Sequence, residues 1–201
     1  MLSVAIQAGG ESRRMGQDKA LLPFLGQPLI VRVLNRVAGI ADEVIVTANQ
    51  PEKFYFLGLK PVPDTQPGAG ALGGLLTALE AAHHPAVAVV ACDMPFVNPL
   101  LLVMALQVLN ESGADLVIPH SPDGLEPFHA VYRRETCLPH VQAALRDGKR
   151  RVDAWFGQVR VHELPPEFIQ TYDPLGLAFL NVNTPEELVR AEQLYQQHTQ
   201  T

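Results

Sequence analysis

Cysteine is scarce in this chain, which has Cys92 and Cys137 among its 201 residues. Two cysteines make neither a disulfide framework nor a thiolate metal cluster, so both kinds of fold are excluded. Long apolar runs are also lacking, and the longest, residues 86–92, is far short of the ~20 residues that cross a bilayer. The sequence does not open with a basic region and a long apolar core, so no signal peptide is expected. We therefore expect a protein of the reducing cytoplasm that does not enter membranes.

Basic residues are fewer than acidic ones, 15 against 21, so the formal net charge is −6 at pH 7. This balance argues against a general surface for nucleic acids or anionic membranes. Hydrophobic residues make up 47% and charged residues 18%, an ordinary globular composition. We expect residues 1–201 to form a single domain, because this length suffices for one α/β domain with a real core.

Strand-like and helix-like segments alternate along the chain. Strands are expected at residues 2–6, 43–48, 87–91, 115–118, 128–132 and 178–180. Helices are expected at residues 28–38, 71–82, 98–112 and 135–146, with a last one capped by Thr184. Such alternation predicts βαβ units and a mostly parallel sheet, whose ligands sit beyond the carboxyl ends of the strands. The glycine loop after the first strand, Asn49, Asp93 and His120 are expected at that edge.

A glycine-rich loop with three cations follows the first strand. It reads Gln7-Ala8-Gly9-Gly10-Glu11-Ser12-Arg13-Arg14-Met15-Gly16-Gln17-Asp18-Lys19. Glycines let the backbone approach a ligand closely, and Arg13, Arg14 and Lys19 place positive charge beside free amides, which suits a polyphosphate. A P-loop is excluded, because Gly16 is not followed by Lys and Ser or Thr. The alternative is a surface loop with solvated arginines.

This loop resembles the A-G-G-x-S-x-R-M-G-x-D-K loop of nucleotidyltransferases, and it is most similar to that of molybdenum cofactor guanylyltransferases. Further motifs follow in matching order up to Leu188. The resemblance implies an α/β, single-domain, Rossmann-like three-layer fold with a mostly parallel central sheet. It implies transfer of GMP from GTP to the terminal phosphate of molybdopterin (Mo-molybdopterin), with Mg²⁺ as cofactor. Molybdenum-insertion proteins and molybdoenzyme chaperones are the macromolecular partners that it suggests.

Asp93 ends an apolar strand and is the main candidate for a metal ligand. A carboxylate at the carboxyl edge of a sheet can hold Mg²⁺ that bridges triphosphate oxygens. Position alone equally allows an Asx turn or a helix cap, but the resemblance implies the metal role, because the family's Asp has the same C-D-x-P setting. The run from Asn181 to Leu188 resembles the family's N-x-N-T-P-E-D-L. Asn181 and Asn183 there can ligate a metal through their amide oxygens or bind a phosphate, whereas helix capping accounts for Thr184.

A second glycine loop, residues 63–74, opens the next helix. Its amide-rich start suits the base or ribose of a nucleotide, and the resemblance implies nucleotide-binding roles for Asp64 and Asn49. The family reads G-P-L-A-G where this chain has G-A-G-A-L-G-G, so the glycine that touches the base stays open. The same letters satisfy G-x-G-x-x-G, the fingerprint of NAD binding. Prolines at 61, 63 and 67 break up the strand that this motif requires, so NAD binding is disfavoured.

Two segments are candidates for the pterin side. His129 lies in Glu126–Arg134, which resembles the family's P-x-H-A-x-Y-R, and a core histidine bonded to backbone is the alternative. Arg151 ends the cationic run 149–151, which helix-dipole effects explain equally well. With Asn183, these residues are expected to face the acceptor.

The resemblance assigns the catalytic roles to Arg13, Lys19 and Asp93, and metal binding to Asp93 with Asn181. The residues expected to bind the nucleotide are Gln7, Ala8, Gly9, Gly10, Arg14, Lys19, Asn49, Asp64 and Asp93. Gln7 stands where the family commonly has Leu. Other classes stay open: a molybdopterin cytidylyltransferase, a sugar- or polyol-phosphate nucleotidyltransferase, and a nucleotide- or cofactor-holding subunit without turnover. The Asp18-Lys19 step and the run NVNTPEEL favour the guanylyl enzyme over its cytidylyl relative.

Overall fold

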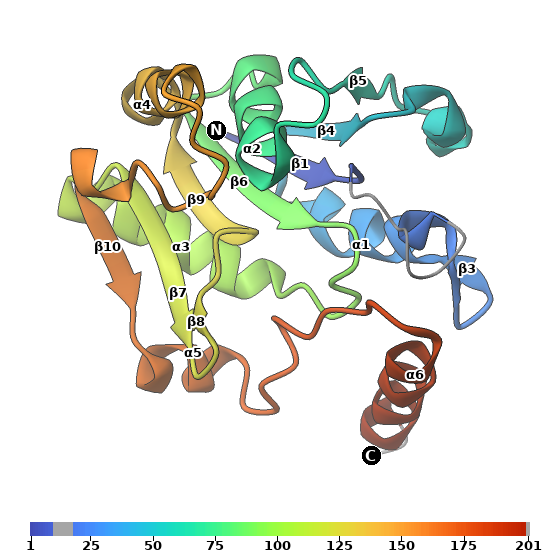
Figure 1. Ribbon diagram of the computed structural model, residues 1–201. Coiled ribbons are helices and arrows are strands. Elements are labelled where there is room, and N and C mark those ends of the chain that lie inside the picture. The colour runs from blue at the N-terminus through green and yellow to red at the C-terminus, as the bar shows by residue number, and fades with distance from the viewer. Residues whose placement is uncertain (10–17, 200–201) are drawn as a thin grey trace.

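The computed structural model describes residues 1–9 and 18–199, which fold around a central sheet. Its strands are β1 (Leu2–Gln7), β4 (Glu43–Ala48), β5 (Val62–Pro63), β6 (Ala86–Ala91), β7 (Leu116–Ser121), β8 (Gly124–Leu125), β9 (His129–Arg133) and β10 (Val161–Leu164). They pair in the order β10-β7-β9-β6-β1-β4-β5, with β8 beside β7 (Figure 1). β1 is parallel to β4 and β6, whereas β9 is antiparallel to its neighbours β6 and β7. The predicted α/β fold with a mostly parallel central sheet is confirmed.

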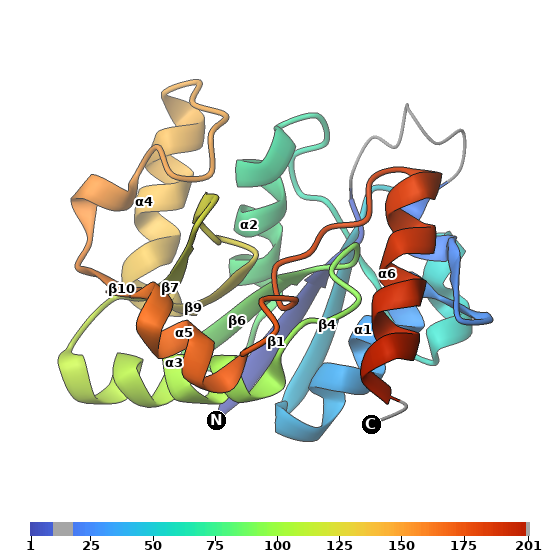
Figure 2. The ribbon, with the colours of Figure 1, turned by 90° about the horizontal axis from the view of Figure 1, so that it is seen from below.

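Helices cover both faces of the sheet (Figure 2). They are α1 (Leu29–Val37), α2 (Gly70–Ala81), α3 (Pro99–Ser112), α4 (Arg134–Arg146), α5 (Pro166–Tyr172) and α6 (Pro185–Thr199). α2 and α4 lie on one face, and α1 and α3 lie on the other, as the three-layer prediction requires. None of the helices in the described residues has the length and apolar character needed to cross a bilayer.

Two cores result from the alternation of side chains along the strands. In β6, Ala88 and Val90 pack in the core under α1 and α3, whereas Val87 and Val89 pack in the core under α2 and α4. Both sets are fully or almost fully buried. This explains why the strand is apolar at every position: a strand buried on both faces has no solvent side.

A third apolar cluster attaches the C-terminal helix. The hairpin of β2 (Pro23–Phe24) and β3 (Gln27–Pro28) contributes Phe24, which packs with Phe96, Val182 and Ala191. The backbone N–H of Leu25 also donates to the Glu192 carboxylate at 2.7 Å. The packing brings the segment before α6 back to the carboxyl end of β6, over ninety residues earlier in the chain.

Both predicted helix caps are confirmed. The Asn98 carboxamide accepts from the N–H groups of Leu100 and Leu101 at 3.0 and 3.3 Å, at the start of α3. Thr184 and Glu187 form a capping box, because Glu187 N–H donates to Thr184 Oγ1 at 3.2 Å and Thr184 N–H donates to Glu187 Oε2 at 3.1 Å.

The predicted strand at 178–180 is wrong, since this stretch has turns and no strand. β5, β8, β10, the hairpin of β2 and β3, and α5 were not predicted.

An ion pair at the start of β7 predicts how stability depends on pH. Asp115 accepts from Arg160 Nε at 3.1 Å, Nη2 at 3.2 Å and N–H at 3.0 Å, and these bonds lower the pKa of its carboxyl to about 2. The stabilisation should be complete above the unfolded pKa of about 3.9 and lost as the pH falls through about 2. Because the Arg160 side chain is largely exposed, we expect about 1–2 kcal/mol. Urea unfolding of Asp115→Asn between pH 2 and 6 should show a flatter pH dependence than the parent, and an unchanged slope would contradict the assignment.

Candidate active site

The predicted nucleotide residues meet at one edge of the sheet. Gln7 ends β1, Asn49 follows β4, Asp64 follows β5, and Asp93 lies just past β6. Backbone bonds continue the sheet past the strand ends: Ala8 N–H donates to Thr47 O at 2.8 Å, Cys92 N–H to Gln7 O at 3.0 Å and Asp64 N–H to Ala48 O at 3.2 Å.

This edge is also a topological switch point. From β1 the chain passes through α1 to β4 on one side, and later through α2 to β6 on the other side. α1 and α2 lie on opposite faces, so the two crossover connections on either side of β1 run over opposite faces of the sheet (Figure 2). Open α/β sheets bind their ligands at such a point.

Lys19 and Asp93 form the charged centre of the site. Lys19 Nζ lies 3.8 Å from Asp93 Oδ2. It also donates a hydrogen bond to Oδ1 of Asn183, which lies 164 positions further along the chain. Lys19 and Asp93 are largely buried, with 24% and 20% of their side chains exposed. Burial raises the pKa of Asp93, and the Lys19 charge partly offsets this effect. An ammonium group and a carboxylate are thus held close together in a largely buried environment.

The segment before α6 completes this centre. Val182 N–H donates to Asp93 O at 2.9 Å, so Asn181 and Asn183 flank a residue tied directly to Asp93. Asn183 N–H in turn donates to Glu187 Oε2 at 2.5 Å, which anchors Asn183 to the capped end of α6. The structure therefore brings together the predicted residues Lys19, Asp93, Asn181 and Asn183.

The donor set fits Mg²⁺ better than a softer metal. In the described part of the chain, no three His, Cys, Asp or Glu side chains come together as a metal site. Asp93 offers a carboxylate, and the exposed Asn181 offers its amide oxygen, since its Nδ2 donates to Phe179 O at 3.1 Å. Mg²⁺ takes one or two protein carboxylates and completes its shell with phosphate oxygens and water. These residues fit such an ion.

Close packing around Gly9 shapes the wall beside Asn49 and Asp64. A Cβ at Gly9 would lie 2.9 Å from Asp64 Oδ2 and 3.5 Å from Asn49 Nδ2, so only glycine fits without a shift. Burial raises the pKa of Asp64, and its Oδ1 is buried with no hydrogen-bond partner among the described residues. A buried oxygen of this kind is a ready acceptor for a ligand N–H or O–H.

The second glycine loop leads into α2 and contacts the cationic run. Gly70, the first residue of α2, has a φ of +67°, which favours glycine. Arg150 Nη1 donates to Gly68 O at 2.6 Å, so the run 149–151 packs against this loop. The interaction joins the nucleotide side of the site to the segment predicted to face the pterin.

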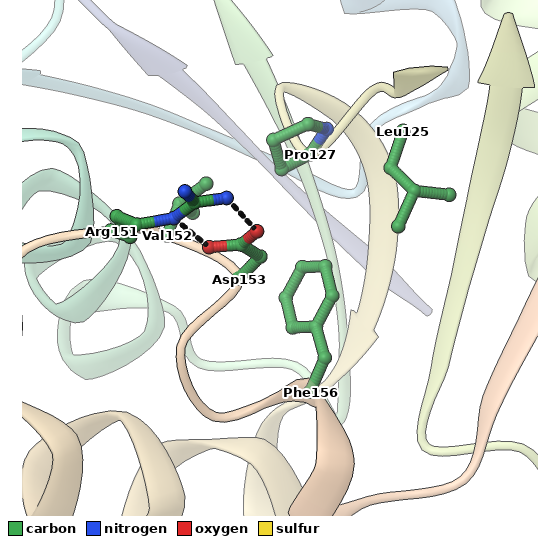
Figure 3. A pocket seen from close by; sticks show the side chains of 6 residues that line it. All are labelled: Leu125, Pro127, Arg151, Val152, Asp153 and Phe156. Atoms are coloured by element: carbon green, nitrogen blue, oxygen red, sulfur yellow. Dashed lines mark hydrogen bonds and ion pairs between the residues drawn. The ribbon is translucent and has the colours of Figure 1, made fainter.

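Arg151 borders a pocket of about 380 Å³ (Figure 3). Its Nε and Nη2 donate to Asp153 at 3.0 and 2.7 Å. The remaining lining residues are Leu125, Pro127, Val152 and Phe156. A guanidinium beside apolar side chains suits a flat polar ring or an anion, and the acceptor-side role of Arg151 stays a prediction.

His129 lies in the core instead of on the pterin side. Its side chain is fully buried, and its Nε2 accepts from Asn98 N–H at 3.0 Å. Burial lowers its pKa to about 4. A substrate contact would need an exposed face, so the expected pterin contact is wrong and the core alternative holds. His120 is exposed on β7, but it bonds Glu163 of β10 at 2.8 Å.

Some predicted residues fall outside the described part, and some contacts were not predicted. Gly10, Arg13 and Arg14 lie outside the described residues. Asp18 was not predicted to act, yet its Oδ1 accepts from Ala20 N–H at 3.3 Å and its Oδ2 lies 3.4 Å from Lys53 Nζ. The bond from Ala20 N–H caps the turn that carries Lys19. A short polar residue before a helical turn is a capping signal that the sequence does display.

Comparison with known proteins points to one family. Residues 4–162 match the MobA-like NTP transferase domain. A probable molybdenum cofactor guanylyltransferase of Pelotomaculum thermopropionicum is 38% identical over 92% of this chain and 89% of its own length. A second, of Chloroflexus aggregans, is 36% identical over 94% of this chain and 92% of its own. The crystal structure of molybdopterin-guanine dinucleotide biosynthesis protein A of Archaeoglobus fulgidus superposes with a TM-score of 0.84 at 28% identity, covering 97% of this chain and 99% of that one.

Proposed function

Because the chain belongs to the MobA-like NTP transferase family, we propose that it transfers GMP from GTP to molybdopterin and releases pyrophosphate. The observation that carries this proposal is the grouping of Lys19, Asp93 and Asn183 at the switch point of the sheet. A cation, a carboxylate and an amide grouped at this edge of the sheet can bind a triphosphate and the metal ion that accompanies it.

The reaction is an in-line displacement at the α-phosphorus of GTP. An oxygen of the terminal phosphate of molybdopterin forms a new P–O bond, and the bond between the α-phosphorus and the oxygen of the β-phosphate breaks. Pyrophosphate leaves with that electron pair. The attacking oxygen is already an anion at pH 7, so the site needs no strong base, and positioning with charge neutralisation remains its task.

Each residue of the charged centre has a defined part in this scheme. Lys19, with Arg13 and Arg14, balances the charge of the triphosphate, and the backbone of Ala8, Gly9 and Gly10 holds the nucleotide. Asp93 and Asn181 would hold Mg²⁺, which neutralises charge on the phosphate oxygens when bound. Asn49 and Asp64 line the wall beside Gly9, where they contact base or ribose.

The acceptor side lies across the switch point from this wall. Arg151 and its pocket are on that half of the site, and Arg150 ties them to the second glycine loop. Asn183 is held between Lys19 and the cap of α6. We propose that this pocket binds the pterin ring and that Asn183 binds the terminal phosphate of molybdopterin.

Nucleotide preference and turnover together test the proposal. Binding of GTP, CTP, ATP and UTP is compared by thermal shift with Mg²⁺, and pyrophosphate release is then followed after molybdopterin is added. A stabilisation specific to GTP, about 2.7 kcal/mol at a hundredfold excess over Kd, with release that needs molybdopterin, is the expected result. A preference for CTP would reassign the nucleotide and keep the reaction class. Binding without any release would favour the nucleotide-holding subunit and overturn the enzyme.

A further inference from the structure

Unmet hydrogen-bonding capacity is concentrated at the nucleotide edge of the sheet. Five buried side-chain atoms lack a hydrogen-bond partner within the described residues, and three of them are Gln7 Nε2, Thr47 Oγ1 and Asp64 Oδ1. They sit at the carboxyl ends of β1 and β4 and just after β5. Leaving such groups unpaired costs free energy, which a ligand with complementary groups recovers. The edge is therefore matched to a polar ligand.

Gln7 has a fixed place in this cluster. Residue 7 faces the same side of the sheet as Ala5, which packs in the core under α2. Its carboxamide rests on the bare Cα of Gly74 in α2, where an added Cβ would lie 2.8 Å from Oε1 and 3.4 Å from Nε2. Gly74 thus leaves the space that the Gln7 side chain fills. The carboxamide is held by packing on its oxygen side, and its Nε2 has no hydrogen-bond partner among the described residues.

We propose that Gln7 is a specificity-determining residue that reads the base of the nucleotide, with its Nε2 donating to O6 of guanine. This inference rests on the proposed function. On the Watson–Crick edge of guanine, the O6 acceptor stands beside the N1–H and 2-amino donors. Gln7 Nε2 and Asp64 Oδ1 supply the complementary donor and acceptor at the same edge of the sheet. Adenine has an amino group where guanine has O6. This amino group and Gln7 Nε2 are both donors, so they could not form a hydrogen bond. The leucine that is common here in the family offers no such bond.

The test compares GTP with 2-aminopurine riboside triphosphate, which lacks both O6 and the N1–H donor and keeps the 2-amino group. We expect the parent protein to bind GTP about 10- to 100-fold more tightly than the analogue. In Gln7→Leu this preference for GTP should fall by about tenfold, because the bond to O6 is lost while the N1–H of guanine is still present. Kd values come from calorimetry on the full chain with Mg²⁺. A Gln7→Leu variant that keeps the parent's ratio would overturn the proposal and leave Gln7 with a packing role only.

Two further variants separate base reading from local packing. Gln7→Glu replaces the donor by an acceptor, so it should prefer 2,6-diaminopurine riboside triphosphate, whose 6-amino group donates, over GTP. Thr47→Val is the matched control, because Thr47 pairs in register with Gln7 and also has an unpartnered buried atom. Thr47→Val should keep the parent's ratio of GTP to analogue affinity. An equal loss of discrimination in Thr47→Val and Gln7→Leu would contradict a specific role for Gln7.

Failure of the inference differs from failure of the proposed function. If the parent binds GTP with the expected discrimination but releases no pyrophosphate with molybdopterin, the enzyme assignment fails and the reading by Gln7 is supported. If the parent binds no guanine nucleotide, both fail. If pyrophosphate release proceeds while GTP and the O6-deficient analogue bind equally, the function stands and the role of Gln7 is overturned.

Discussion

Asp93→Ala is expected to lower the rate of Mg²⁺-dependent pyrophosphate release by about 10²- to 10³-fold, or about 2.7–4 kcal/mol of barrier. The substitution removes the carboxylate proposed to hold the metal and leaves Lys19 Nζ without the charge at 3.8 Å. The backbone bond from Val182 N–H to Asp93 O does not need the side chain, so the segment before α6 should stay in place. Turnover should therefore fall much more than GTP affinity. Steady-state pyrophosphate release and calorimetric Kd values for GTP measure the two effects.

A carboxylate remote from the site provides the control for Asp93. Glu163→Gln removes the same charge from β10, at the far edge of the sheet, where Glu163 is half exposed and bonds His120. We expect less than about a twofold change in rate for this variant, since exposed ion pairs contribute little. Asp93→Ala with near-parental activity at saturating Mg²⁺ would refute the metal role of Asp93.

Local signals in the sequence were sufficient for most of the sheet and its caps. β4 has the predicted bounds, because EVIVTA is a β-branched apolar run that ends at polar residues. The strand β6 was also predicted from an unbroken apolar run. Asn98 and Thr184 were identifiable because a capping side chain acts on N–H groups two or three residues ahead. Such features depend on neighbours along the chain and need no tertiary information.

Packing decided the elements that were missed or wrongly predicted. β10 reads VHEL, with two polar residues between two apolar ones, and it forms because it pairs with β7 at the sheet edge. Residues 178–180 are apolar like a strand, but they pair with no strand in the described part of the chain, and Ala178 is fully buried in the core under α1 and α3. The burial of His129 has the same origin, since it depends on its position in β9 between two paired strands.

The site followed from topology only in part. Parallel strands place their carboxyl ends at one edge, so the proximity of Asn49 and Asp93 was a consequence of the predicted sheet, whereas Asp64 follows β5, a short strand that was not predicted. The bond between Lys19 and Asn183 joins residues 164 positions apart, and it depends on how α6 packs against the hairpin. No local pattern encodes that packing. The resemblance to a family was what indicated Asn183.

Lys19→Met is expected to lower the rate of pyrophosphate release by about 10²- to 10³-fold, similar to Asp93→Ala. Lys19 Nζ contacts both the Asp93 carboxylate and Asn183 Oδ1, so it links the segment after β6 to the segment before α6. Its charge also lowers the pKa of Asp93 against the effect of burial. Removing it leaves a poorly solvated carboxylate next to incoming phosphates, so GTP affinity should fall as well as turnover. Both quantities are measured as for Asp93→Ala.

The neighbouring lysine provides a matched control for Lys19. Lys53→Met removes the same charge from a side chain that is 41% exposed and pairs with Asp18 at 3.4 Å, next to Lys19 in sequence. If the charge of Lys19 at its own position matters, Lys53→Met should keep the rate within about threefold, because an exposed pair contributes about 0–1 kcal/mol. Equal losses in both variants would mean that net charge near the loop, and not the contacts of Lys19, sets the rate. Lys19→Arg tests geometry at constant charge: the longer, planar guanidinium does not reproduce a point donor between Asp93 and Asn183, so it should recover only part of the activity.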